Sequence, residues 1–209
     1  MSQKREILPG FIVLEGIDGS GTTTQLKRLE TRFKKLHIRS CFSFEPSNGP
    51  VGELIREALS GRFNALPSTI ARLFAADRAE HLYGSKGIVD QLKAGKIAVS
   101  DRYLFSSLAY QGLTCGEELP AMLNASFPLP ELLLFFKLDP DTAISRMQSR
   151  KGLEIYENLD FQKRVANAYD RVVSSFDDSG MKIVCLDASN NPEFVEEAVW
   201  QAVSAILPA

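Results

Sequence analysis

A segment of nine residues near the start of the chain contains three glycines followed by three threonines. Gly16-Ile17-Asp18-Gly19-Ser20-Gly21-Thr22-Thr23-Thr24 stands between an apolar run and an amphipathic stretch that begins near Gln25. Glycines let a backbone curl with its N–H groups inward, and the N-terminus of a following helix adds positive charge, so this loop is suited to phosphates. A glycine-rich turn without a ligand is the alternative. The strand predicted before the loop and the helix predicted after it favour the phosphate site.

One position of the phosphate-loop pattern GxxxxGK[ST] is not met. Thr22 stands where the pattern has lysine, and Thr23 supplies the hydroxyl that the pattern uses for magnesium. The lysine ammonium normally reaches the β- and γ-phosphates, and losing one such charge typically slows transfer about a hundredfold to a thousandfold. Either another cation replaces it here, or the protein is slow.

A second candidate segment is Leu73 to Ala79, on a predicted helix with Ser68 as its cap. Phe74 and Arg78 are four positions apart and share a helix face, so an aromatic plate and a guanidinium can meet a nucleobase and its oxygens. The alternative is an apolar Phe74 in the core beside a solvated Arg78.

Two further segments carry charge in places where a ligand would need it. Asp101 and Arg102 follow a predicted strand, where parallel sheets bind their ligands. Further along, Arg146, Arg150 and Lys151 have no balancing acids and predict an arm that closes over polyphosphate. A solvated helix end is the alternative for this cluster.

The apolar pattern predicts the elements that hold these residues. Short runs that are apolar at odd and even positions alike predict strands buried on both faces, the central strands of a parallel sheet. They are Phe11 to Leu14, Ile97 to Val99, Leu132 to Phe136 and Ile183 to Leu186, with a less regular run from Ile38 to Phe44. Helical spacing lies between them, and Asn191-Pro192 predicts the cap of a last helix over Phe194 to Ile206. This alternation predicts an α/β domain with helices on both faces of the sheet.

Composition excludes several classes of protein. The 209 residues suit a single domain, and 24 basic against 26 acidic side chains give a net charge of -2. A polymeric nucleic acid or an anionic membrane is therefore not expected as a partner. Cys41, Cys115 and Cys185 are predicted to be reduced thiols in or near the core. No secretory or membrane-spanning stretch is evident, so the expected compartment is the cytoplasm.

Taken together, these segments resemble the thymidylate kinase family of nucleoside monophosphate kinases over almost the whole chain. The motifs are FIVLEGIDGSGxTTQ, EPxxGPxGELIRE from Glu45, LFAADRAEH from Leu73, DRYxxSSLAYQG from Asp101, YEN from Tyr156 and LDAS from Leu186. DRYxxSSLAYQG is the most specific of them. The resemblance implies a P-loop fold with a five-stranded parallel sheet, a short lid over about residues 146–158 of a single domain 1–209, and a homodimer.

The resemblance also implies roles for individual residues. Phe74 would stack on thymine, Arg78 would contact a base carbonyl, and Ser107 with Gln111 would read the base edge. Asp18 matches the carboxylate that meets the deoxyribose 3′-hydroxyl, and Tyr156 matches an aromatic residue that disfavours a 2′-hydroxyl. The residues expected at the acceptor nucleotide are Asp18, Glu45, Pro46, Arg56, Phe74, Arg78, Arg102, Ser106, Ser107, Gln111 and Tyr156, with Glu157 near that end.

The donor side is assigned in the same way. The residues expected at ATP are Gly16, Ile17, Asp18, Gly19, Ser20, Gly21, Thr22, Thr23, Thr24 and Arg146. Thr23 and Asp101 match positions associated with magnesium. Asp18, Arg102 and Arg150 are the expected catalytic residues. Phe44 departs from the pattern, because many bacterial members have an arginine before Glu-Pro.

Three functional hypotheses follow. The first is a kinase that moves the γ-phosphoryl group of MgATP to dTMP, giving dTDP and ADP. The second, which depends on Thr22 alone, is a nucleotide-binding protein of the same fold with little or no catalysis. The third keeps the enzyme but changes the substrate to dUMP, another nucleoside monophosphate or a deoxynucleoside.

Overall fold

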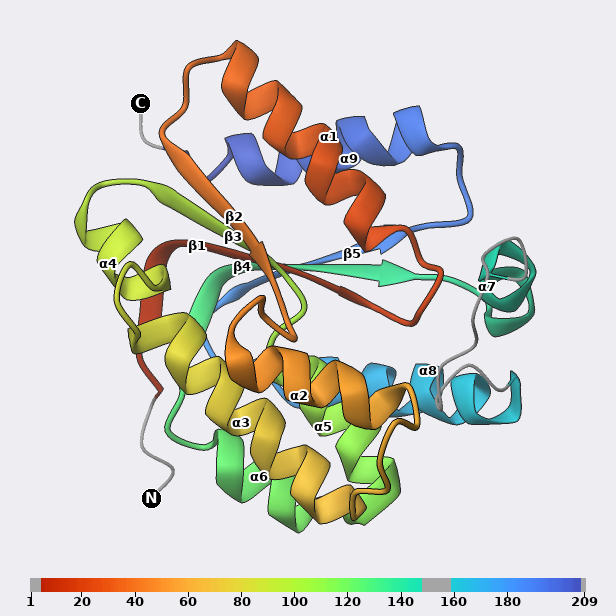
Figure 1. The fold of residues 1–209 in the computed structure, drawn as a ribbon. Helices are drawn as coiled ribbons and strands as arrows, with labels where there is room; N and C mark the ends of the chain where they lie inside the picture. Colours follow the sequence, from red (N-terminus) through yellow and green to blue (C-terminus); the bar gives the residue numbers. More distant parts are fainter. Residues whose placement is uncertain (1–4, 148–158, 208–209) are drawn as a thin grey trace.

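A parallel sheet forms the centre of the computed structural model, which describes residues 5–147 and 159–207 (Figure 1). Within these residues the strands are β1 (Ile7–Gly16), β2 (Ser40–Phe44), β3 (Ile97–Asp101), β4 (Leu129–Lys137) and β5 (Lys182–Asp187). They pair in the order β2-β3-β1-β4-β5, and every pair is parallel. Each parallel connection needs a crossover, so helices must cover the faces of the sheet.

Helices cover both faces, which confirms the predicted fold class. In Figure 1, α1 (Thr22–Lys35) and α9 (Pro192–Ser204) lie over one face. The other face is covered by a larger group, which comprises α2 (Pro50–Leu59), α3 (Pro67–Tyr83), α5 (Leu104–Cys115), α6 (Glu118–Asn124) and α8 (Leu159–Ser174). The short helices α4 (Ile88–Lys93) and α7 (Pro140–Met147) lie near opposite ends of the strands.

The strands differ in how deeply they are buried, and this corrects two predictions. β3 is buried along its whole length, and β1 is buried from Phe11 to Gly16, as expected for central strands. β2 and β5 are not central, because they form the two edges of the sheet and most of their side chains are half-buried or exposed. For the same reason the predicted near-core position of Cys185 is wrong, since this thiol is exposed on β5. Cys41 and Cys115 are half-buried.

Helix ends also differ from the prediction in three places. α1 begins at Thr22 rather than near Gln25, because Gly21 takes the left-handed φ of +94° at the cap position. Ser68 does not cap α3, because Pro67 occupies the first turn and moves the cap position to Leu66. The predicted cap of α9 is confirmed, since the Asn191 side chain accepts the Phe194 N–H at 2.8 Å, although α9 runs from Pro192 to Ser204.

The topology brings the predicted functional segments together at the carboxyl ends of the strands. β1 leads into the glycine loop, β2 ends at Phe44 directly before Glu45, and β3 ends at Asp101. The Glu45 N–H donates to the Asp101 carbonyl oxygen at 3.0 Å, and the Arg102 N–H donates to the Leu14 carbonyl oxygen at 2.8 Å. These backbone bonds fix the three segments to one another at the carboxyl ends of the strands.

Candidate functional site

The glycine loop packs between β1 and α7 in a conformation that requires glycine. Gly19 has a left-handed φ of +83°, and a Cβ atom there would lie 2.6 Å from the Ala143 carbonyl oxygen of α7. The Ser20 hydroxyl is buried and has no hydrogen-bond partner among the described residues. An unsatisfied buried hydroxyl beside a helix N-terminus is a place where a ligand oxygen can complete the bonding.

Thr23 and Asp101 meet at the loop, as the sequence predicts for a magnesium site. The Thr23 hydroxyl donates to Asp101 Oδ2 at 2.6 Å, and Asp101 Oδ1 is buried without a partner among the described residues. Magnesium prefers such oxygen ligands, and usually takes one or two from protein and the rest from phosphates and water. The pair therefore fits magnesium. The described part of the chain contains no group of three His, Cys, Asp or Glu side chains that would hold a metal ion alone.

Asp18 and Arg102 form an ion pair between the loop and the end of β3. Arg102 Nη2 donates to Asp18 Oδ1 at 2.5 Å, and Arg102 Nη1 donates to Ser106 Oγ at 3.0 Å. Burial disfavours the guanidinium charge, but nearby Asp18 and the tyrosine hydroxyls outweigh it and hold the pKa of Arg102 well above its ordinary value. Arg102 adopts a left-handed φ of +74°, a conformation that costs energy in a residue with a side chain. Strain of this kind is typical of functional positions.

Asp18 also accepts hydrogen bonds from two helices that cover the sheet. The Tyr110 hydroxyl of α5 donates to Asp18 Oδ2 at 2.9 Å, and Gln162 Nε2 of α8 donates to the same oxygen at 3.0 Å. Burial, together with the charge of Asp18, raises the pKa of Tyr110, so its hydroxyl keeps its proton. The loop carboxylate is thus held in a single orientation.

A cavity opens beside this ion pair and contains much of the predicted acceptor site. It is lined by Asp18, Pro46, Leu59, Phe74, Arg102, Ser106, Tyr110 and Gln111. Leu59 and Tyr110 were not predicted as site residues. Tyr110 lies inside the DRYxxSSLAYQG motif, so the motif itself was the available signal, whereas nothing distinguishes Leu59 from a core leucine. Phe74 lines this cavity and also packs against the small cluster of Ile55, Ala58, Leu59 and Ile70.

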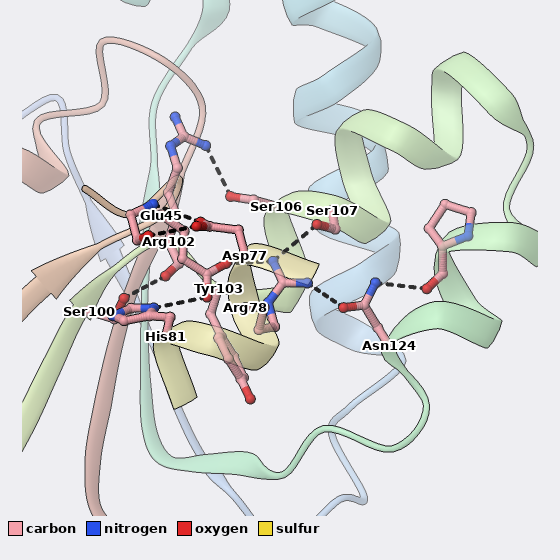
Figure 2. Close-up of polar contacts among 12 residues, drawn as sticks. Glu45, Asp77, Arg78, His81, Ser100, Arg102, Tyr103, Ser106, Ser107 and Asn124 are labelled. Carbon is pink, nitrogen blue, oxygen red and sulfur yellow. Dashed lines mark hydrogen bonds and ion pairs between the residues drawn. The ribbon is translucent and has the colours of Figure 1, made fainter. Parts of the chain in front are cut away.

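Arg78 is not among the residues that line this cavity, and Figure 2 shows its hydrogen bonds with Ser107 and Asn124. Its side chain is fully buried, which excludes the solvated alternative. The guanidinium donates to Glu45 Oε2 at 2.6 Å, to Ser107 Oγ at 3.1 Å and to Asn124 Oδ1. It also lies over the Tyr103 ring, 5.2 Å from its centroid.

Three other predicted acceptor residues occupy supporting positions. Glu45 is buried by its bond to Arg78 and lies 3.2 Å from Nδ1 of His81. Ser107 is buried against Arg78. Arg56 Nη1 donates to the carbonyl oxygens of Pro46 at 2.9 Å and Ser47 at 2.8 Å, and so braces the segment after β2.

The donor side of the loop opens into a second hollow of about 300 Å³. Its lining residues are Gly19, Ser20, Gly21, Thr24, Gln25, Arg146, Ala188, Asn190, Pro192 and Val195. Arg146 Nη1 donates to the Ala188 carbonyl oxygen at 3.1 Å, which connects α7 to the LDAS segment. The sequence had assigned no role to that segment. Arg150, Tyr156 and Glu157 lie outside the described residues.

A wider hollow of about 650 Å³ lies between α5, α6 and α8, among residues such as Ala109, Gly112, Ala121 and Ala168. It contains no residue of the glycine loop, so it does not compete as the phosphate site. Among the residues that the structure describes, no helix combines the length and the apolar character that crossing a bilayer requires.

Comparison with known proteins agrees with this geometry. The family model described as thymidylate kinase matches residues 14–199. A putative thymidylate kinase of Treponema pallidum is 40% identical over 197 residues, which cover 92% of this chain and 94% of the relative. A probable thymidylate kinase of Pyrobaculum aerophilum is 36% identical over 199 residues, covering 94% and 97% of the two chains. One from Methanocaldococcus jannaschii is 41% identical over 160 residues, covering 76% and 79%. The chain therefore belongs to the thymidylate kinase family.

Proposed function

We propose that this protein transfers the γ-phosphoryl group of MgATP to dTMP and releases dTDP and ADP. The observation that carries the proposal is that Asp18 belongs to two parts of the site. This residue belongs to the glycine loop and also lines the neighbouring cavity, where it binds Arg102. The phosphate loop and the acceptor cavity therefore share a wall, which is the arrangement that direct transfer between two nucleotides needs.

The roles of individual residues follow from this arrangement. Backbone N–H groups of residues 16–24 and the N-terminus of α1 would hold the donor phosphates. Thr23 and Asp101 would hold magnesium, which would supply positive charge to the phosphates. Arg102 would hold the acceptor phosphate near the loop, and Arg146 and Arg150 would act at the donor nucleotide. Homodimer formation and a cytoplasmic compartment remain expectations from the family resemblance.

The acceptor cavity favours a nucleotide with a flat base and a deoxyribose. Phe74 offers a stacking surface, and Gln111 offers an amide to the base edge. The Asp18 and Tyr110 pair at the same wall can bond one sugar hydroxyl. In this proposal Pro46 lines the pocket, and Glu45, Arg56, Arg78 and Ser107 support its walls.

Thr22 favours a second candidate function, a nucleotide-binding protein with weak or no turnover. Thr22 is buried at the start of α1 and brings no charge to the loop. Arg102 approaches the loop from the acceptor side and Arg146 from the donor side. These two guanidinium groups are our candidates to replace the missing ammonium.

Ligand-dependent melting tests the substrate class without assuming turnover. A ligand present at about a hundred times its dissociation constant adds about 2.7 kcal/mol of stability, which is easily seen as a shift in melting temperature. We expect dTMP to raise the melting temperature more than dUMP, dCMP, dGMP or thymidine does. A larger shift with dCMP or dGMP would exclude the thymidylate assignment.

A further inference from the structure

Glu15 is a fully buried carboxylate whose chemistry the predicted site does not use. It is the penultimate residue of β1 and is 0% exposed. Its Oε1 accepts the backbone N–H groups of Tyr103 at 2.8 Å and Ser106 at 3.1 Å, so it serves as the cap that α5 lacks among its own side chains. Its Oε2 accepts the hydroxyls of Ser106 at 2.7 Å and Tyr169 at 2.8 Å. A single carboxylate thus receives four donors from α5 and α8.

The two hydroxyls that bind Glu15 are the same groups that hold Arg102. Arg102 Nη1 donates to Ser106 Oγ at 3.0 Å and to the Tyr169 hydroxyl oxygen at 3.3 Å. A hydroxyl has one proton to give and two lone pairs to accept with. When both protons point to Glu15, both oxygens turn lone pairs toward Arg102. The guanidinium is then fixed on this edge, and its other edge faces Asp18 in the cavity wall.

The oxygens of Glu15, Ser106 and Tyr169 form a closed triangle. Ser106 Oγ and the Tyr169 hydroxyl oxygen lie 2.7 Å apart, besides their bonds to Glu15 Oε2. With the carboxylate ionised, the cluster contains only the two hydroxyl protons, so each hydroxyl oxygen keeps a lone pair for Arg102. A proton or an amide hydrogen on Glu15 would occupy lone pairs of these hydroxyls. Their own protons would then turn toward each other or toward Arg102, which is itself a donor.

We propose that Glu15 is a positioning residue for phosphate recognition, which makes acceptors of Ser106 and Tyr169 so that Arg102 is presented to the acceptor phosphate. The inference rests on the proposed function, because the ligand of Arg102 is taken to be the phosphate of dTMP. Glu15 itself touches neither nucleotide in this arrangement.

The surroundings of Glu15 make its protonation sensitive to pH near neutrality. Burial raises its pKa to about 7, against the opposing effects of Arg102, the hydroxyls of Ser106 and Tyr169, and the Tyr103 N–H. The titratable groups that face this cluster are Arg102 and Tyr103 at the start of α5, Tyr169 on α8, and, beyond Arg102, Asp18 of the loop and Tyr110 of α5. Burial and the charge of Glu15 raise the pKa of Tyr169 well above its ordinary value, so that hydroxyl keeps its proton.

The test is calorimetric titration of dTMP and of thymidine into the protein and into Glu15→Gln at about pH 8, where Glu15 is ionised. A hydrogen bond to a charged group is worth about tenfold or more in affinity, so Glu15→Gln should weaken dTMP about tenfold. Thymidine has no phosphate, and its affinity should be unchanged. The matched control is Glu131→Gln, because Glu131 of β4 also accepts a backbone N–H, from Gly10 at 2.6 Å, but at the far end of the sheet. It should alter neither affinity.

The pH profile separates positioning from packing. As the pH falls to about 5.5, Glu15 becomes neutral in the unsubstituted protein, and the difference in dTMP affinity from Glu15→Gln should disappear. Ionisation of the phosphate of dTMP affects both proteins alike and cancels in the comparison. Tyr169→Phe keeps the carboxylate and removes one acceptor of Arg102, so it should weaken dTMP selectively as well.

Different results identify which part of the account fails. Unchanged dTMP affinity in both Glu15→Gln and Tyr169→Phe would overturn the role of Glu15 while leaving the proposed function intact. An equal loss for dTMP and thymidine would show that the residue only packs the pocket. If the unsubstituted protein bound dTMP no more tightly than thymidine, Arg102 would not read phosphate, and the proposed function would fail with the inference.

Discussion

Asp18 Oδ1 lies 2.5 Å from Arg102 Nη2, although the two residues are 84 positions apart in the sequence. The pair exists because β1 and β3 are hydrogen-bonded neighbours whose carboxyl ends lie at the same edge of the sheet. One partner belongs to the phosphate loop, and both line the acceptor cavity. The ion pair therefore connects the glycine loop with the proposed acceptor cavity.

Substitution of Arg78 distinguishes a base contact from buried support. Arg78→Met should lower the free energy of unfolding by about 3–5 kcal/mol, because it leaves the buried Glu45 carboxylate without its main cation. Urea unfolding measures the change. Arg72→Met, on the exposed face of the same helix, should change stability by less than about 0.5 kcal/mol. If Arg78→Met retained its stability and lost only dTMP binding, the base-contact role would be correct instead.

Phe74 should contribute to dTMP binding through stacking. Phe74→Ala is expected to weaken dTMP by about 1–3 kcal/mol, the range for a base stacked on an aromatic ring. The measurement is calorimetric titration, with Leu73→Ala as control, since Leu73 packs against the same small cluster but does not line the cavity. A loss of thermal stability as large as the loss of binding would assign Phe74 to the core alone.

Arg150 is expected to act on the moving phosphoryl group. Arg150→Ala should lower turnover by about one to three orders of magnitude with a modest loss of dTMP binding, because a cation at the transition state contributes little to ground-state binding. Steady-state kinetics at saturating dTMP check this, with Lys93→Ala, an exposed position on α4 outside the proposed site, as control. Unchanged turnover in Arg150→Ala would remove the residue from the catalytic set.

Stability should depend on pH through Glu15. The pKa of this carboxyl is about 7 in the folded protein, against an ordinary value of 4.5. Between these two pH values the carboxyl is protonated in the folded state and ionised in the unfolded state. The contribution of Glu15 to stability is thus fully present below about pH 4.5 and is lost as pH rises through about 7, by up to about 3 kcal/mol. Urea unfolding at several pH values should show this slope in the protein and not in Glu15→Gln. Parallel slopes would contradict it.

The sequence was sufficient for the fold class and for six of the eight residues that line the proposed acceptor cavity. β1, β3 and β4 were predictable because strands buried on both faces are apolar at odd and even positions alike. The motif DRYxxSSLAYQG identified Arg102, Ser106 and Gln111. The edge position of β5 was not predictable, because its residues are as apolar as those of a central strand.

The supporting groups behind the cavity could not be predicted either. The burial of Arg78 depends on Asn124 and Glu45, which reach it from α6 and from the end of β2. Glu15 belongs to the motif FIVLEGIDGSGxTTQ, but its role was not predictable, since its partners lie 88 to 154 positions away in the chain. Such contacts depend on the packing of helices against the sheet, which the spacing of residue types does not encode.

The most direct test of the central claim is steady-state ADP formation from MgATP and dTMP, with the protein as it is and with Thr22→Lys prepared in parallel. The account predicts turnover of about 1 per second or faster before substitution, within the usual range for kinases, with guanidinium groups replacing the ammonium. It also predicts no more than a modest gain from Thr22→Lys. A silent protein that Thr22→Lys makes active would contradict the proposed kinase activity and support nucleotide binding without catalysis.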